Sequence, residues 1–310
     1  MFLVSNVELV VASCRSGVIG TFPSANCRTA SELDSWLTNI RGQLDEHEAA
    51  TGQRSAPYCP NLIVHKSNPR LVEDLAILLK HGPELVITSV GSPAPVIAPL
   101  HEAGALVFAD VATLKQAHKA VEAGADGLIL LTAGAGGQTG WLNPFAFARA
   151  VREWFDGTLV LAGGISDGHA LAAARVLGCD LGYMGTRFIA TTQSAASATY
   201  KEMLVASGAD DIVLTSAFTG LPANLLRASL LKAGLDPLDL PVHGPLNIAA
   251  DISIEAHARR PKAWKEVWSA GHSTAGVKSI LSVEQLVMQT LQEYRAARGT
   301  AQHATQRSQR

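Results

Sequence analysis

Two glycine-rich segments, each placed directly after a short apolar run, constrain the fold of this chain most strongly. One is Gly163-Gly164-Ile165-Ser166-Asp167-Gly168, after the run 158–162, and the other is Gly185-Thr186-Arg187-Phe188, after the run 181–184. Each segment also opens a helical pattern, so both glycine turns are expected at strand ends, where they offer backbone N–H groups to one anion. In an eight-stranded α/β barrel, a phosphate group usually sits at the turns after strands seven and eight. The two segments therefore predict a phosphorylated ligand at the mouth of a barrel.

Short apolar runs alternate with helical patterns along the first two thirds of the chain, which is typical of strand–helix repeats around a parallel sheet. We expect eight strands, at residues 2–4, 18–20, 58–64, 85–88, 105–109, 127–132, 158–162 and 181–184. Helices are expected at residues 7–16, 29–48, 69–80, 93–103, 114–123, 144–155 and 195–207. The strands lack polar alternation, as strands buried on both faces do. A doubly wound sheet would carry GxGxxG after its first strand, and none stands there, so the sequence predicts an α/β fold of the (β/α)8 TIM-barrel class.

The remainder of the chain is expected to decorate this barrel, which spans residues 1–209. Residues 210–282 show no clear strand–helix period, so we interpret them as an elaboration that covers the barrel mouth, with helices at 222–233 and 256–268. Residues 283–310 are expected to form a C-terminal helix, over 283–295, that packs back on the barrel and ends in a frayed tail.

Composition and charge argue against several function classes. The chain has 310 residues and a net charge of −2, which does not favour binding to nucleic acid or to an acidic membrane surface. No apolar run reaches ~18 residues and the first residues lack a basic segment, so neither a membrane span nor a signal peptide is expected. The four cysteines show no CxxC spacing, which predicts buried thiols in a reducing cytoplasm and no metal site. The sequence leaves open whether the chain forms a homodimer.

A third glycine-rich segment, Ala133–Gly140, follows the sixth expected strand. It reads Ala-Gly-Ala-Gly-Gly-Gln-Thr-Gly, and four glycines in eight residues argue against a helix or a strand interior. One interpretation is backbone laid flat against a planar ligand, with the Gln138 side chain presented to the substrate. The other is an ordinary flexible loop. Three glycine-rich loops at successive strand ends, on the functional face of a barrel, favour the first interpretation.

With these segments the chain resembles the nitronate monooxygenase family, formerly called 2-nitropropane dioxygenases, whose members are FMN-dependent TIM barrels. The resemblance runs through nearly the whole chain. It is carried by the glycine-rich segments in this order, together with Phe22–Asn26, Asn61–His65, Gly124–Leu128 and Trp268–His272. Related barrels include flavin-dependent quinone reductases and an enoyl-thioester reductase, so the shared segments identify the cofactor better than the reaction.

The resemblance implies an FMN site built from five strand ends and the third glycine-rich segment. The implied contacts are Met1, Phe2, Leu3, Asn61, Asp110, Gly137, Gly163, Gly164, Gly185 and Thr186. The last four would hold the FMN phosphate, Met1 to Leu3 would lie along the isoalloxazine edge, and Asn61 would hydrogen-bond the flavin pyrimidine. Asp110 takes a place where several relatives carry lysine, and its carboxylate would meet a flavin N–H or a ribityl hydroxyl. For Asn61 and Asp110, a loop-capping side chain is the alternative.

Gln138 is the candidate catalytic residue and the main departure from the family. The family's glycine loop usually ends in a histidine beside the flavin, suited to taking the α-proton of a neutral nitroalkane or to binding the nitronate anion. The amide of Gln138 can only hydrogen-bond. We therefore expect an FMN-dependent oxidoreductase that oxidises a preformed nitronate with dioxygen to a carbonyl compound and nitrite, and that processes neutral nitroalkanes poorly.

Other assignments remain open at this stage. His65, His169 and His272 are weak substitutes for the missing histidine, and Arg187 is expected either as a charge near the phosphate or in a structural ion pair. Relatives carry a short segment before the point at which this sequence begins, so either the true start lies upstream or the first strand is shortened. Two alternative functions also stand: a flavin-dependent NAD(P)H:quinone or enoyl reductase, and a flavin-binding relative that has lost catalysis.

Overall fold

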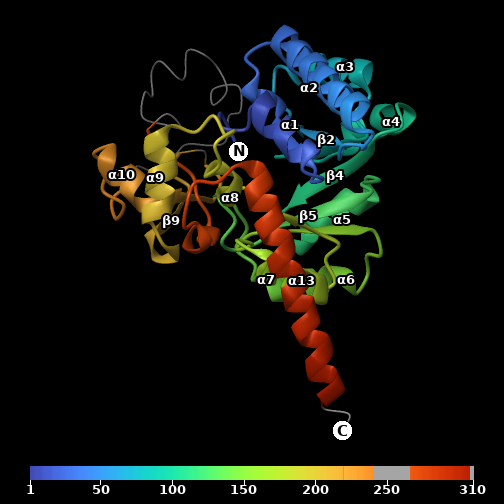
Figure 1. The fold of residues 1–310 in the computed structure, drawn as a ribbon. Helices are drawn as coiled ribbons and strands as arrows, with labels where there is room; N and C mark the ends of the chain where they lie inside the picture. The colour runs from blue at the N-terminus through green and yellow to red at the C-terminus, as the bar shows by residue number, and fades with distance from the viewer. Residues whose placement is uncertain (219, 241–265, 308–310) are drawn as a thin grey trace.

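The computed structural model describes residues 1–218, 220–240 and 266–307, and its centre is a curled sheet of parallel strands (Figure 1). Seven strands pair in the order β1-β2-β3-β4-β5-β7-β8. They are β1 (Gly20–Pro23), β2 (Tyr58–Ile63), β3 (Leu85–Ser89), β4 (Leu106–Val111), β5 (Gly127–Leu131), β7 (Thr158–Ala162) and β8 (Leu181–Tyr183). Every pairing is parallel, so the carboxyl ends of the strands lie at one rim, where barrels of this class bind ligands. The expected α/β barrel class is confirmed.

Helices alternate with the strands, and the helices between the strands cover the outside of the main sheet (Figure 1). They are α1 (Val7–Arg15), α2 (Ala30–Thr51), α3 (Leu71–His81), α4 (Ala94–Glu102), α5 (Leu114–Glu122), α6 (Pro144–Arg152), α7 (Gly168–Val176), α8 (Thr186–Ile189), α9 (Ala198–Ala206), α10 (Arg227–Lys232) and α13 (Val283–Arg307). Short 3-10 helices lie at Ser24–Asn26, Ala209–Asp211 and His272–Gly276. Several helices begin at a residue whose side chain caps the first turn. Thr29 Oγ1 accepts a hydrogen bond from the N–H of Glu32 at the start of α2, and Thr113 Oγ1 accepts one from the N–H of Gln116 at the start of α5.

The expected first strand at residues 2–4 is wrong. Residues 1–5 form a turn in which two backbone N–H groups donate to the Met1 carbonyl. Leu3 has a φ of 62°, and left-handed backbone of this kind does not continue a strand. The Asn26 side chain accepts from the Leu3 N–H at 2.9 Å and holds the turn beside the end of β1.

Among the described residues, no backbone ladder joins β1 to β8, the two outer strands of the sheet. A side-chain hydrogen bond links them instead, because the hydroxyl oxygens of Thr21 and Tyr183 lie 3.0 Å apart. The strand expected at 18–20 is observed two residues later, as β1. Helix α13 packs against α7 and also contacts α1, so it runs along the outside of this part of the barrel (Figure 1). The C-terminal helix expected at 283–295 is therefore present, and it continues to Arg307.

A second, smaller sheet adjoins the barrel. The strands β6 (Gly137–Gln138) and β9 (Ile212–Thr215) both pair antiparallel with β10 (Ala223–Leu226). The helix expected at 222–233 is therefore wrong in its first half, because all four residues of β10 are buried between two partner strands and the helix begins only at Arg227. The helix expected at 256–268 lies mostly outside the described residues. In the described part of the chain, no helix has the length and apolar character needed to cross a lipid bilayer.

Candidate active site

A cavity of about 1130 Å³ opens at the carboxyl ends of the strands and continues into the barrel. Every strand of the main sheet contributes to its wall, as do the segments 134–138 and 267–269. All ten residues expected to contact the cofactor line this cavity, and so does Gln138. The structure thus brings together strand ends that are far apart in the sequence. The cavity is somewhat larger than the usual ligand pocket of about 300–1,000 Å³, so it has room for a nucleotide-sized ligand.

Gly163–Gly164 and Gly185–Thr186, which we call the glycine cradle, follow the neighbouring strands β7 and β8. Gly163 and Gly164 have φ angles of 128° and 73°, which favour glycine. A Cβ on Gly164 would meet no atom within 4 Å, so the space beside it is open. No hydrogen bond between described residues uses the backbone N–H of Gly164, Gly185 or Thr186. Free N–H groups beside open space suit an anion such as a phosphate.

The glycine loop, residues 133–137, packs backbone against backbone on Gly271 and His272. The Gly134 carbonyl accepts from the His272 N–H at 2.9 Å, and a Cβ on Gly136 would approach the Gly271 nitrogen to 2.7 Å. Close packing within the protein therefore requires glycine at Gly136, whether or not a planar ligand also lies against this loop.

Gln138 is half-buried and lines the cavity. It lies in β6, opposite Ala223 of β10, so the ladder holds its backbone in place. The segment Ala133–Gly140 was expected to contain no strand, and this expectation is wrong at Gly137 and Gln138, which form β6. The histidines considered as substitutes lie outside the residues that line the cavity: His65, His169 and His272.

Three polar side chains form a hydrogen-bonded chain across the ends of β2, β3 and β4. Ser89 Oγ donates to Asn61 Oδ1 at 2.7 Å, and Asn61 Nδ2 donates to Asp110 Oδ2 at 3.4 Å. The other carboxylate oxygen, Asp110 Oδ1, is buried without a hydrogen-bond partner in the described part of the chain. Burial raises the pKa of Asp110 to about 7, although the Asn61 hydrogen bond and the Met1 α-ammonium act in the opposite direction. The sequence analysis did not identify Ser89 as a site residue. The signal was available, because this polar residue directly follows the expected strand 85–88 and so lies at the rim of the barrel.

The first three residues line the cavity as a turn. A Cβ on Gly185 would lie 3.5 Å from Met1 Sδ, while the Met1 α-ammonium interacts with the Asp110 carboxylate. Burial lowers the pKa of that ammonium group. Met1 therefore reaches from the glycine cradle to the Ser89–Asn61–Asp110 chain.

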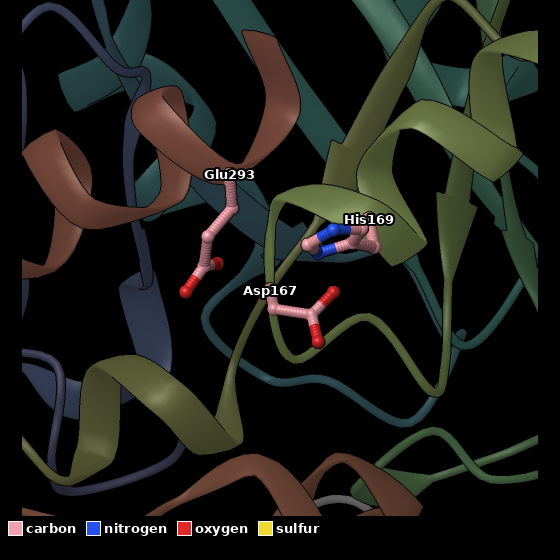
Figure 2. Close-up of side chains that lie close together, drawn as sticks. All are labelled: Asp167, His169 and Glu293. Carbon is pink, nitrogen blue, oxygen red and sulfur yellow. The ribbon is translucent and has the colours of Figure 1, made fainter. Parts of the chain in front are cut away.

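Asp167, His169 and Glu293 gather where α7 begins, just beyond the glycine cradle (Figure 2). Their donor atoms lie within 4.8 Å of one another. Both carboxylates bond to backbone, because Asp167 caps the first turn of α7 and Glu293 Oε2 accepts from the Gly168 N–H at 3.0 Å. The buried Arg187 lies near the same carboxylates, whose charges oppose the lowering of its pKa by burial. The hydrogen bond from Gly168 to Glu293 ties α13 to the turn that carries the cradle.

Comparisons with known proteins agree with this geometry. The family profile described as nitronate monooxygenase matches residues 3–293. A nitronate monooxygenase of Paraburkholderia phytofirmans is 30% identical over 224 residues, which cover 68% of this chain and 61% of that protein. A (3aS,4S,5R,7aS)-5-hydroxy-7a-methyl-1-oxo-octahydro-1H-indene-4-carboxyl-CoA dehydrogenase of Mycobacterium tuberculosis is 28% identical over 232 residues, which cover 74% of this chain and 62% of that protein. The chain thus spans about three fifths of the length of these curated relatives.

Solved structures show the same architecture. A nitroalkane oxidase from Streptomyces ansochromogenes matches with a TM-score of 0.79 at 25% identity, over 96% of this chain and 94% of that one. FabK from Thermotoga maritima matches with a TM-score of 0.80 at 24% identity, over 98% and 93%, and this likeness shows the fold alone. Because the family profile covers nearly the whole chain, this protein belongs to the nitronate monooxygenase family of flavin-dependent oxidoreductases.

Proposed function

We propose that this protein is an FMN-dependent nitronate monooxygenase that oxidises alkyl nitronates with dioxygen to carbonyl compounds and nitrite. The observation that carries the proposal is the glycine cradle at the rim of a large cavity. The backbone N–H groups of Gly164, Gly185 and Thr186 have no hydrogen-bond partner among the described residues, and the space beside Gly164 is open. Membership of a flavin-dependent family supports a flavin as the ligand, and a phosphate-binding cradle favours its phosphorylated form, FMN.

The residues around the cavity fit this cofactor. Gly164, Gly185 and Thr186 would hold the phosphate, and Asn61 and Asp110, which line the cavity, would face the pyrimidine. We propose that the remaining contacts are Met1, Phe2, Leu3, Gly137 and Gly163. When bound, FMN supplies the electron-transfer chemistry, while the protein supplies binding, orientation and electrostatics.

The protein's own contribution to the reaction is to bind an anion and to exclude water. The Gln138 amide lines the cavity and donates hydrogen bonds, so it suits the negatively charged oxygens of a nitronate. Tyr200 and Trp268 stack with ring centroids 4.9 Å apart and line the same cavity, where they form an apolar wall. Because an amide takes no proton at neutral pH, this site is suited to a substrate that arrives already deprotonated.

Initial rates with a nitronate and with its neutral parent nitroalkane test the proposal. The FMN-loaded protein is expected to consume oxygen and release nitrite with the nitronate, and to be at least about tenfold slower with the neutral compound. The variant Gln138→His introduces a group that accepts a proton near pH 7, so it should raise the rate with the neutral nitroalkane at pH 7.5. Equal rates of the unaltered protein with both compounds, or no nitrite from the nitronate, would contradict the proposal.

A flavin-dependent dehydrogenase or reductase acting on an acyl thioester or a quinone is the second candidate. The likeness to a carboxyl-CoA dehydrogenase, and the lack of a basic side chain at Gln138, favour it. Anaerobic bleaching of the bound flavin by NADH or NADPH, with no bleaching by a nitronate, would select this function. A flavin that stays oxidised with all of these reductants would indicate a relative that has lost catalysis.

We further propose that residues 1–209 bind the flavin, that residues 210–282 cover the substrate side, and that residues 283–310 pack on the barrel and end in a tail. A reducing cytoplasm suits the four free, buried cysteines. Light scattering of the purified protein will distinguish a monomer from a homodimer.

A further inference from the structure

The cavity does not stop at the rim of the barrel. Gly17 and Val18 precede β1, and Leu181 is the first residue of β8, so these three residues lie at the amino ends of the two strands. They line the same cavity as Met1 and Gly185, which lie at the rim. In the described part of the chain, no backbone ladder joins β1 to β8. The cavity therefore runs along the length of the opening between these two strands, which we call the seam.

Helix α13 covers the outside of the seam. It contacts both α7, which precedes β8, and α1, which precedes β1 (Figure 1). Four of its residues line the cavity at a spacing that places them on one face of the helix: Val287, Thr290, Leu291 and Tyr294. Leu181 and Leu291 are 39% and 42% exposed although both line the cavity, so side-chain packing leaves this end of the cavity unfilled.

The lining of the seam is mainly apolar. Side chains from four elements contribute to it: Val10 from α1, Leu171 from α7, Leu181 from β8, and Val287 and Leu291 from α13.

Two charged side chains lie at the outer end of the seam, and they are paired with each other. Arg175 Nη1 lies 3.4 Å from Asp180 Oδ1 and also donates to the Asp180 carbonyl oxygen at 2.9 Å. An anion such as a nitronate thus meets no unpaired cation among the described residues that line the seam. An uncharged apolar molecule needs none, because it loses no favourable hydration when it enters an apolar passage.

The seam also lies apart from the proposed substrate contact. Gln138 follows β5, whereas the glycine cradle follows β7 and β8, so the cradle lies between Gln138 and the seam in the order of the sheet. An alkyl chain on a substrate held at Gln138 would have to pass the phosphate site to enter the seam. At the rim the seam ends beside Met1, whose Sδ lies 3.5 Å from the position of a Cβ on Gly185. A small second reactant could thus reach the proposed flavin edge from the seam without crossing the substrate site.

We propose that the seam is the route by which dioxygen reaches the flavin, separate from the entrance used by the nitronate. The inference rests on the proposed function, because it requires a flavin beside Met1 and a reaction that consumes dioxygen. Dioxygen is small, uncharged and apolar, so it partitions into a passage that does not attract the anionic substrate. A separate route allows dioxygen to arrive while the substrate occupies the Gln138 side of the cavity.

The variant Val287→Trp tests this route, because a larger side chain on the cavity-lining face of α13 would fill the seam. Met288→Trp is the matched control, since Met288 is the next residue of α13, is 55% exposed and does not line the cavity. Stopped-flow mixing of the reduced, FMN-loaded proteins with dioxygen measures reoxidation of the flavin. We expect the rate constant to fall about fivefold or more in Val287→Trp and to stay within about twofold of the unaltered protein in Met288→Trp. Anaerobic reduction of the flavin by a nitronate should be equally fast in all three proteins.

Xenon, an apolar gas, gives a second readout that does not depend on how well the variant folds. Xenon-pressurised crystals of the unaltered, FMN-loaded protein should hold xenon between α13 and the seam. Equal reoxidation rates in the two variants, or no xenon in the seam, would overturn the inference and leave the proposed function standing. The same holds if Val287→Trp slows only the reduction by long-chain nitronates, because the seam would then bind the alkyl chain of the substrate. Failure of nitronates to reduce the flavin of the unaltered protein would overturn the proposed function, and this inference with it.

Discussion

At the scale of single residues, Gly164 gives the sharpest test of the glycine cradle. The variant Gly164→Ala places a methyl group in the open space beside free N–H groups, at a φ of 73°. Gly52→Ala is a matched control, because Gly52 has a φ of 68°, equally open surroundings and a place at the end of α2, outside the cavity. Both variants should lose about 1–2 kcal/mol of stability through backbone strain.

Only Gly164→Ala is expected to weaken FMN binding, by about tenfold or more, because the methyl group displaces the phosphate from its N–H donors. Isothermal titration of both variants with FMN measures this difference. Equal affinities in the two variants would show that the phosphate does not bind beside Gly164.

Asp110 also predicts a pH dependence of stability. The folded protein holds this proton to about pH 7, whereas the unfolded chain releases it near the ordinary value of about 3.9. Between these values the folded state binds more protons, so the contribution of Asp110 to stability falls as pH rises, and the full loss is present above pH 7. Replacing Asp110 by asparagine removes this loss, and the variant should gain up to a few kcal/mol relative to the unaltered protein between pH 5 and pH 8. Urea unfolding of the flavin-free proteins at both pH values measures the gain, and a pH-independent difference would contradict it.

The glycine cradle at the rim of a barrel could be predicted from the pattern of apolar runs and glycine turns, and Met1, Asn61 and Asp110 could be predicted as cavity residues from the resemblance to the family. Their interactions could not. The donor–acceptor order from Ser89 through Asn61 to Asp110 depends on which strands are neighbours in the sheet. The desolvation that raises the pKa of Asp110 likewise depends on tertiary packing.

At the scale of elements, the contact between α7 and α13 determines how the C-terminal helix is held. A Cβ on Gly168 would overlap the backbone of α13 at Thr290 and Tyr294. Gly168→Ala should therefore displace α13 and destabilise the protein by about 1–3 kcal/mol. The control Gly42→Ala, in an open position of α2, should stabilise it by about 0.5–1 kcal/mol. Chemical denaturation measures both changes, and a neutral Gly168→Ala would show that the two helices are not packed this closely.

The elements that the sequence predicts best are those whose burial is set locally. The run 158–162 is β7 with the same bounds, because five consecutive apolar or β-branched residues are bounded by turns on both sides. The strand predicted at 2–4 and the first part of the helix predicted at 222–233 are wrong for tertiary reasons. Asn26 stabilises a turn in the first, and pairing with β6 and β9 draws the start of the second into a sheet.

At the scale of the whole molecule, the fold converts three glycine-rich segments into one site. The parallel order of the sheet brings the ends of β5, β7 and β8 to one rim, and the small sheet of β6, β9 and β10 holds the glycine loop beside them. Asn224 Nδ2 donates to the Ala135 carbonyl at 2.8 Å, and the Gly271 N–H donates to Thr186 Oγ1 at 3.1 Å. The glycine loop and the cradle are thus joined through segments that lie far along the chain.

The central claim is that this rim binds a flavin by its phosphate, and a comparison of FMN with riboflavin tests it most directly. The two ligands share the isoalloxazine ring and ribityl chain and differ only in the phosphate. Fluorescence titration of the flavin-free protein should show FMN binding at least about 100-fold more tightly than riboflavin, because charge-assisted hydrogen bonds from several N–H groups are lost without the phosphate. Equal affinity for the two ligands, or no binding of FMN by well-folded protein, would contradict the account.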